Sequence, residues 1–245
     1  MKQGRFEIKE NTVLAADTYK MVLTGDTTDV TAPGQFVNIA LPGRFLRRPI
    51  SVCDRSEGRL TLLYKTVGGG TTQMAAMGPG DTLDILTGLG NGFSLEESGQ
   101  TPLLAGGGIG AAPLYWLAKE LVRRGVRPHA ALGFNRAADV FYADEFAALG
   151  CAVTVATADG GAGARGFVTD AMKGVSYSYV YACGPEAMLR AVWDRAETDG
   201  QFSFEARMGC GFGACMGCTR QTTAGPKRVC KDGPVFRKGE ILWEA

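Results

Sequence analysis

The chain has 245 residues, of which 45% are hydrophobic and 21% are charged, and its formal net charge at pH 7 is +1. This is the composition of an ordinary globular protein, and the charge gives no reason to expect nucleic acid or an acidic membrane surface as a partner. No apolar run reaches the ~18 residues of a membrane-spanning helix, and no apolar segment of a secretory signal follows Met1, so we expect a cytoplasmic protein in which disulfides are rare.

The first part of the chain predicts a small antiparallel β-barrel. Apolar and polar residues alternate over 5–24, which indicates two strands, and Gly or Pro turns bound further strands at 35–40, 59–65 and 81–86. Short strands separated by such turns are typical of a closed barrel. A short helix is expected at 71–77.

The middle of the chain alternates between strands and helices. The expected strands are 101–105, 127–133, 152–157 and 179–183, and the expected helices are 111–121, 141–149, 168–172 and 186–197. This alternation predicts parallel strands in a doubly wound sheet. The fold class is therefore α/β plus all-β, with a small C-terminal part after the sheet.

The C-terminal part is rich in glycine and cysteine and has little periodicity, so we expect a metal centre, rather than an apolar core, to hold it together. Cys210, Cys215 and Cys218 have the spacing C-x4-C-x2-C, and Cys230 follows twelve residues later. This is the plant-type spacing for a 2Fe–2S cluster. Structural zinc usually has two paired CxxC knuckles, of which only one is present, and it remains the alternative.

Two turns of the middle domain suggest nucleotide binding. A glycine-rich turn joins its first strand to its first helix and consists of Gly106, Gly107, Gly108, Ile109 and Gly110. Such a turn offers backbone N–H groups and a helix N-terminus to a pyrophosphate. A second turn ends the last strand, at the same edge of the sheet, and consists of Cys183, Gly184 and Pro185. Taken alone, each turn is also an ordinary strand-to-helix connection.

Two segments of the barrel suggest flavin binding. The first opens a strand and consists of Arg48, Pro49, Ile50 and Ser51. An arginine pairs with phosphate, and a serine hydroxyl hydrogen-bonds the edge of an isoalloxazine ring. The second leads into the short helix and includes Lys65, Thr66, Val67, Gly70, Thr71 and Thr72. Its open backbone N–H groups and hydroxyls suit a phosphate, although a basic loop and a flexible turn would look the same.

The order of barrel, nucleotide domain and cysteine-rich tail resembles the ferredoxin reductase superfamily. More closely, it resembles the electron-transfer subunits of NAD-dependent dihydroorotate dehydrogenases. The resemblance covers essentially the whole chain, and its most specific parts are residues 48–51, 106–113, 183–185, 208–218 and 229–236. The broad superfamily usually has a tyrosine at the third position of this motif. This chain has Ile50 there, as the dihydroorotate subgroup does, so stacking on the flavin must come from residues that the sequence does not identify.

The resemblance implies a role for each of these segments. FAD would be lined by Arg48, Pro49, Ile50 and Ser51, with Lys65, Thr66 and Val67 along it and Gly70, Thr71 and Thr72 around its phosphates. Residues 106–110 would hold the NAD pyrophosphate, and the turn at 183–185 would lie near the nicotinamide. The four cysteines would bind the 2Fe–2S cluster. The expected domains are 1–98 for FAD, 99–202 for NAD and 203–245 for the cluster.

The resemblance also implies a partner. An FMN-containing catalytic subunit would oxidise dihydroorotate, and electrons would pass through the cluster and FAD to NAD+, a step of pyrimidine biosynthesis. We expect a heterotetramer with two copies of each subunit. Alternatives are a subunit of a ferredoxin:NADP or sulfide dehydrogenase-type complex, a zinc-stabilised binding module, and a stand-alone reductase. Four cluster cysteines favour the dihydroorotate interpretation, because some relatives of the first alternative have an aspartate in place of one of them.

Four further residues bear on nucleotide choice and on the core. No acidic residue directly follows the second strand of the middle domain, where one would favour NAD, and Arg136 would attract a 2′-phosphate. We nevertheless expect NAD, from the resemblance. The single histidine, His129, is expected to be structural, and Cys53 is expected, like Cys151, to be a small core residue.

Overall fold

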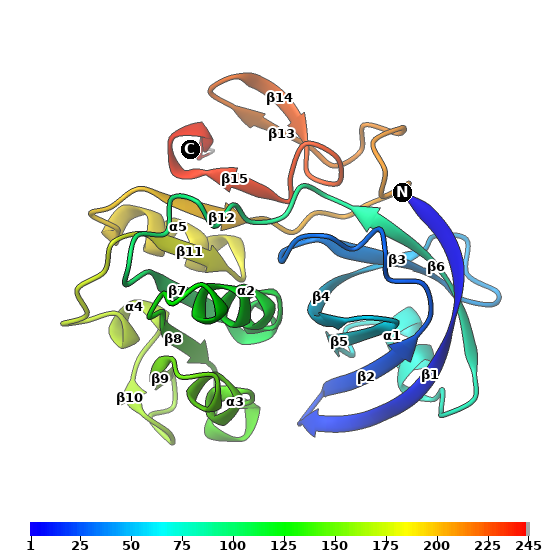
Figure 1. Cartoon of the computed structure of the whole chain (residues 1–245), viewed down its shortest axis with the longest axis horizontal. Coiled ribbons are helices and arrows are strands. Elements are labelled where there is room, and N and C mark those ends of the chain that lie inside the picture. Colours follow the sequence, from blue (N-terminus) through cyan, green and yellow to red (C-terminus); the bar gives the residue numbers. More distant parts are fainter. Residues whose placement is uncertain (244–245) are drawn as a thin grey trace.

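The computed structural model describes residues 1–243, and its N-terminal part is a closed antiparallel barrel (Figure 1). The six strands are β1 (Lys2–Ala15), β2 (Thr18–Thr24), β3 (Phe36–Ala40), β4 (Arg48–Ser56), β5 (Arg59–Lys65) and β6 (Thr82–Leu89), in the order β1-β2-β5-β4-β3-β6. Buried residues alternate with more exposed ones along β6, because successive side chains of a strand point to opposite faces. Helix α1 (Gly69–Ala75) lies two residues earlier than expected.

The second sheet has seven strands in the order β10-β9-β8-β7-β11-β12-β15. Its parallel strands are β7 (Leu103–Gly107), β8 (His129–Phe134), β9 (Ala152–Thr157), β10 (Ala164–Arg165), β11 (Val180–Cys183) and β12 (Gly200–Ser203). Strand β15 (Val235–Arg237) joins β12 antiparallel. The doubly wound parallel sheet was therefore predicted correctly, whereas the edge strands β10 and β15 and the strand β12 beside β15 were not expected.

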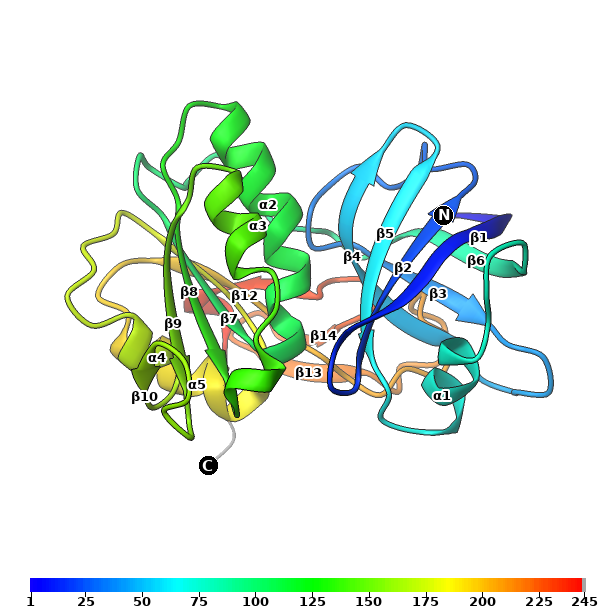
Figure 2. The ribbon, with the colours of Figure 1, turned by 90° about the horizontal axis from the view of Figure 1, so that it is seen from below.

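Helices cover both faces of this sheet. They are α2 (Ala111–Arg123), α3 (Ala143–Ala148), α4 (Val168–Ala171) and α5 (Glu186–Arg195), with short 3-10 turns at Gly108–Gly110, Ala137–Asp139 and Lys238–Glu240. The first two helices share one apolar core cluster, and the last two belong to the other. Helix α2 lies between the sheet and the barrel (Figure 2), so its N-terminal end faces the junction of the two domains.

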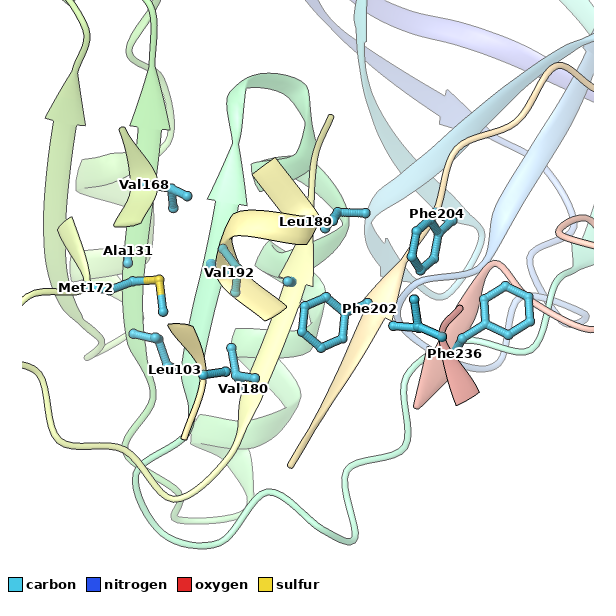
Figure 3. Close-up of a cluster of buried hydrophobic side chains, with 14 of the residues drawn as sticks. Leu103, Ala131, Val168, Met172, Val180, Leu189, Val192, Phe202, Phe204 and Phe236 are labelled. Atoms are coloured by element: carbon cyan, nitrogen blue, oxygen red, sulfur yellow. The ribbon is translucent and has the colours of Figure 1, made fainter. Parts of the chain in front are cut away.

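The C-terminal part is held by an apolar core, which corrects the expectation that a metal centre alone would hold it. Phe204, Val229, Phe236 and Ile241 are buried in the same cluster as the helices α4 and α5. Figure 3 shows this cluster extending from Leu103 to Phe236. The strands of the C-terminal part are β15, β13 (Thr219–Thr222) and β14 (Gly225–Arg228), of which the last two form a hairpin. The sequence did not predict them because strands of three or four residues are too short to show a period.

Strand β12 ends at residue 203, close to the predicted boundary, and pairs with β15, so the sheet continues from the middle part of the chain into the C-terminal part. The predicted boundaries at 98/99 and 202/203 stay predictions. Within residues 1–243, no helix is both long and apolar enough to cross a membrane.

Candidate functional site

A cavity of about 410 Å³ lies where the barrel, the parallel sheet and the C-terminal part meet. The barrel contributes Phe36, Arg48, Pro49, Ile50, Ser51, Leu63, Tyr64, Lys65, Val67, Gly68, Gly69, Gly70 and Thr71. The parallel sheet contributes Ile109, Gly110, Ala112, Pro113, Cys183 and Ser203, and the C-terminal part contributes Phe204, Glu205, Ala206, Met208 and Pro234. Segments that lie far apart in the sequence thus form one concave surface.

On the barrel side, Arg48 lies against the N-terminal turn of α1. A Cβ atom on Gly70 would overlap the Arg48 guanidinium, so glycine is what permits this approach. The guanidinium donates to the carbonyl oxygen of Leu46, and no carboxylate pairs with it among the residues described. Lys65, in contrast, forms an ion pair with Asp17 at 3.1 Å. Arg48 is therefore the cavity-lining cation that remains available to a phosphate.

Thr71 shapes the loop that precedes α1. Its hydroxyl donates to the Gly68 carbonyl oxygen at 3.1 Å and accepts from the Val67 N–H at 3.0 Å. The hydroxyl is thus engaged within its own loop, and the loop's backbone lines the cavity. Thr66 and Thr72, which were predicted alongside it, do not line the cavity.

On the sheet side, the two predicted nucleotide turns lie against each other. A Cβ atom on Gly110 would overlap the carbonyl group of Cys183, so glycine allows α2 to start directly beside the end of β11. Of these two turns, Ile109, Gly110 and Cys183 line the cavity. The predicted residues that do not line it are Gly106, Gly107, Gly108, Gly184 and Pro185. Their role in holding NAD remains a prediction.

Burial shifts the pKa of two ionisable side chains in the wall near Cys183. Burial raises the pKa of the Cys183 thiol to about 12, although the Ser203 hydroxyl opposes the shift. Burial also raises the pKa of Glu205, which lines the same part of the cavity. A thiol with so high a pKa is not a nucleophile at neutral pH, so the chemistry of the cavity must come from bound groups.

The four predicted cluster ligands lie in two pairs. The Cys210 and Cys215 side chains contact each other, as do those of Cys218 and Cys230. The N–H of Ala214 donates to Cys210 Sγ at 3.2 Å, and the N–H of Cys230 donates to Cys218 Sγ at 3.4 Å. Burial raises the pKa of Cys210, but backbone N–H groups outweigh it and bring the value to about 6. Backbone donors therefore stabilise the thiolate, the form that binds iron.

This pairing fits a two-iron cluster, in which four thiolates are shared between two irons that sulfides bridge. A zinc ion would instead need all four thiolates around one point. Within residues 1–243, no group of three or more histidine, cysteine, aspartate or glutamate side chains is arranged to bind one metal ion. Cys215 is exposed and Cys230 is buried, so the site leads from the surface inward.

The cluster loop follows directly from the cavity wall. Met208 lines the cavity, and Cys210 is two residues further along the chain. The Asn38 side chain of β3 donates to the Cys210 carbonyl oxygen at 3.1 Å and so fixes the loop to the barrel. The proposed flavin and cluster sites are therefore adjacent.

Sequence reasoning missed the aromatic side chains of the cavity, which are Phe36, Tyr64 and Phe204. These are the candidates for the flavin contact that Ile50 does not supply. The Arg220 guanidinium lies 3.9 Å from the centre of the Phe204 ring and forms a 2.7 Å ion pair with Glu186 at the start of α5. No motif marked these residues, although Phe204 directly precedes the glycine- and cysteine-rich tail.

Comparisons with known proteins agree with this geometry. Residues 205–242 match the family described as the iron–sulfur cluster binding domain of dihydroorotate dehydrogenase B. The chain is 48% identical over 207 residues, 80% of each chain, to the "Dihydroorotate dehydrogenase B (NAD(+)), electron transfer subunit" of Bacillus caldolyticus. It is also 48% identical over 209 residues, again 80% of each chain, to the protein of the same name from Bacillus mycoides (strain KBAB4).

Two solved structures are similar. The structure of NADH-dependent reduced ferredoxin-NADP oxidoreductase matches with a TM-score of 0.88 and 31% identity, over 97% of this chain and 90% of that one. Phthalate dioxygenase reductase, described as modular for electron transfer from pyridine nucleotides to [2Fe-2S], matches with a TM-score of 0.63 and 25% identity, over 78% of this chain and 63% of that one.

Proposed function

The chain belongs to the family of electron transfer subunits of NAD-dependent dihydroorotate dehydrogenase B, and on this premise we propose that it carries electrons from an FMN-containing catalytic subunit to NAD+. Its cofactors are FAD, a 2Fe–2S cluster and NAD. The step belongs to pyrimidine biosynthesis, as the family name implies. The observation that carries the proposal is the single cavity bordered by the barrel, the nucleotide turns and the segment that leads to the cluster cysteines.

FAD, when bound, supplies the exchange between two-electron chemistry at a nicotinamide and one-electron chemistry at an iron–sulfur cluster. The chain's own residues bind and orient the groups. Arg48, Ile50 and Ser51 line the cavity, which supports a role for Arg48 in pairing with a phosphate of FAD and for Ile50 and Ser51 in bordering its flavin ring. The contact between Gly110 and Cys183 shapes the opening through which the nicotinamide would enter.

The cluster would be held by Cys210 and Cys215 on one iron and by Cys218 and Cys230 on the other, since these are the pairs in contact. Backbone N–H groups that face the sulfurs of Cys210 and Cys218 would tune its reduction potential. Exposed Cys215 marks the side from which a partner would approach.

The words "electron transfer subunit" in the relatives' names imply a catalytic partner. We propose a complex with two copies of each subunit. We also propose a cytoplasmic location, where disulfides are rare, since none of the seven cysteines forms a disulfide in the part of the chain that the structure describes. The chain is 48% identical to the dihydroorotate dehydrogenase subunit but only 31% identical to the ferredoxin-NADP oxidoreductase structure. The comparison therefore favours a dihydroorotate dehydrogenase partner over the alternative.

The test is co-expression of this chain with the dihydroorotate dehydrogenase catalytic subunit of the same organism. We expect the two to co-purify with FAD and two irons per copy of this chain, and with FMN on the partner. Dihydroorotate should then drive NADH formation. The catalytic subunit alone is the control and should reduce a dye but not NAD+. Stoichiometric zinc without iron, or reduction of NADP+ only when reduced ferredoxin is supplied, would refute the proposal.

A further inference from the structure

Exposed apolar side chains flank the Arg48 end of the cavity. The Phe45 side chain is 99% exposed, that of Val67 80% and that of Leu46 45%. Phe45 and Leu46 lie in the loop between β3 and β4, and Val67 lies in the loop before α1. Large apolar side chains left in water beside a cavity commonly mark a binding surface.

The two loops are tied to each other, so Phe45 is not at the tip of a free loop. Arg44 donates to the Gly69 carbonyl oxygen at 3.1 Å and to Gln73 Oε1 at 3.1 Å, and Gln73 donates to the Pro42 carbonyl oxygen at 3.0 Å. Figure 2 shows the β3–β4 loop beside α1. These bonds hold the backbone just before Phe45 against the turn where the phosphates of FAD are proposed to bind.

The shape of FAD explains why an aromatic surface is needed there. The cavity offers about 410 Å³, and the segments proposed to bind the flavin ring and the phosphates line it. The adenosine half continues beyond the phosphates and must leave the cavity at their end. Phe45 is not a lining residue of the cavity, and it lies on the loop bonded to that end. An aromatic ring stacks on a nucleobase without needing polar partners.

We propose that Phe45, flanked by Leu46 and Val67, is the surface on which the adenine ring of FAD stacks. This inference rests on the proposed function, because it takes the flavin cofactor and its phosphate site from there. The same residues would also suit a protein partner. The adenine is favoured because the loop's hydrogen bonds run to Gly69 and Gln73 of α1, beside the phosphate site.

The experiment compares FAD with FMN, which has the same flavin and one phosphate but no adenosine. Flavin is removed from the purified subunit, and each flavin is titrated back into wild type, Phe45→Ala and Phe45→Trp. Because stacking contributes about 1–3 kcal/mol per base, Phe45→Ala should weaken FAD binding ~5- to 150-fold. FMN affinity should not change, and Phe45→Trp should restore FAD binding.

Phe167→Ala is the matched control, since Phe167 is 67% exposed and lies in the parallel-sheet domain, just before α4. It should leave the affinity for both flavins unchanged. Phe45 is almost fully exposed, so truncation should not lower the melting temperature of the flavin-free protein. If Phe45→Ala does lower the melting temperature, Phe45→Leu provides the second comparison. FAD, but not FMN, should again bind more weakly to that variant.

Two results would overturn the inference. One is an unchanged FAD affinity in Phe45→Ala. If that variant also forms a weaker complex with the catalytic subunit, the exposed side chains of Phe45, Leu46 and Val67 bind the partner instead. The other is an equal loss of FAD and FMN. Failure of the proposed function looks different, because wild type itself would then bind no FAD and support no dihydroorotate-driven NADH formation.

Discussion

The side-chain amide of Asn38, in the barrel strand β3, donates a 3.1 Å hydrogen bond to the carbonyl oxygen of Cys210, 172 residues away in the sequence. Asn38 is only 2% exposed. The donor side chain is therefore buried. Its bond connects the barrel that is proposed to hold the flavin with the first ligand of the cluster loop. A hydrogen bond of this kind fixes the loop's position relative to the cavity.

Replacing Asn38 with alanine should loosen the cluster loop. The Cys210 carbonyl oxygen would lose its donor, at a cost of about 1–3 kcal/mol for a buried group. We expect the cluster to be lost from Asn38→Ala roughly 5- to 100-fold faster under a chelator, while FAD is retained. Loss of the cluster's visible absorbance over time measures this. Asn135→Ala, at an exposed position in the other domain, should behave as wild type, and equal decay rates in all three proteins would contradict the prediction.

Cys215→Ser should separate the two electron-transfer steps. Cys215 is the exposed member of its pair, and a serine oxygen is a poorer ligand for iron than a thiolate. Dihydroorotate-driven NADH formation should fall at least ~100-fold, because it requires the cluster. Reduction of a dye by NADH should keep much of its rate, because that path needs only FAD. Isolated Cys151 gives the control Cys151→Ser, in which both activities should persist. Loss of FAD together with the cluster would show that the two sites are not independent.

We predict that the choice between NAD and NADP depends on an ion pair that the sequence did not reveal. Arg136 forms a 2.8 Å ion pair with Asp139, and its guanidinium lowers the pKa of that carboxyl group. The arginine that would attract a 2′-phosphate is thus already neutralised. Asp139→Ala should raise kcat/KM for NADPH by about 10-fold, because a freed arginine can pair with the phosphate. The value for NADH should change little. Steady-state rates of dye reduction test this, and an unchanged NADPH efficiency would count against the role of Asp139.

Some of these features were readable from the sequence because chemistry fixes their spacing. Three of the four thiolates that hold a 2Fe–2S cluster come from one short loop with a fixed spacing, so Cys210, Cys215 and Cys218 were recognisable. A strand that runs into glycines before a helix is equally constrained by the backbone, and Gly110 does line the cavity. Long strands and helices also showed their periods clearly.

Other features depend on contacts between distant segments, which leave no local pattern. Phe204 is an ordinary aromatic residue until β12 places it at the cavity wall, with Arg220 over its ring. Strand β15 has three residues, and only its pairing with β12 makes it a strand. Such elements are stabilised by tertiary packing rather than by their own propensity, so a single sequence does not reveal them.

The only histidine of the sequence offers a prediction about pH. His129 Nε2 lies 3.0 Å from Thr154 Oγ1, and the Thr154 hydroxyl donates its single hydrogen to the Ala171 carbonyl oxygen at 2.8 Å. The hydroxyl can therefore only accept from the imidazole, so neutral His129 carries its hydrogen on Nε2. This arrangement supports the expectation of a structural role.

Burial lowers the pKa of His129 below its ordinary value of 6.5. The unfolded chain therefore binds a proton more readily than the folded chain does, and the free energy of unfolding must fall as the pH drops through about 6.5. His129→Gln keeps a donor for Thr154 but cannot be protonated. Between about pH 7.5 and 5.5, its stability in urea should depend less on pH than that of wild type.

Because no other histidine is present, the imidazole C–H proton signals of His129 can be followed by NMR without assignment. They should titrate with a midpoint below 6.5 in the folded protein, and below that midpoint His129 should cause no further loss of stability in the urea experiment. A midpoint at or above 6.5, or identical pH slopes for wild type and His129→Gln, would show that burial does not control this proton.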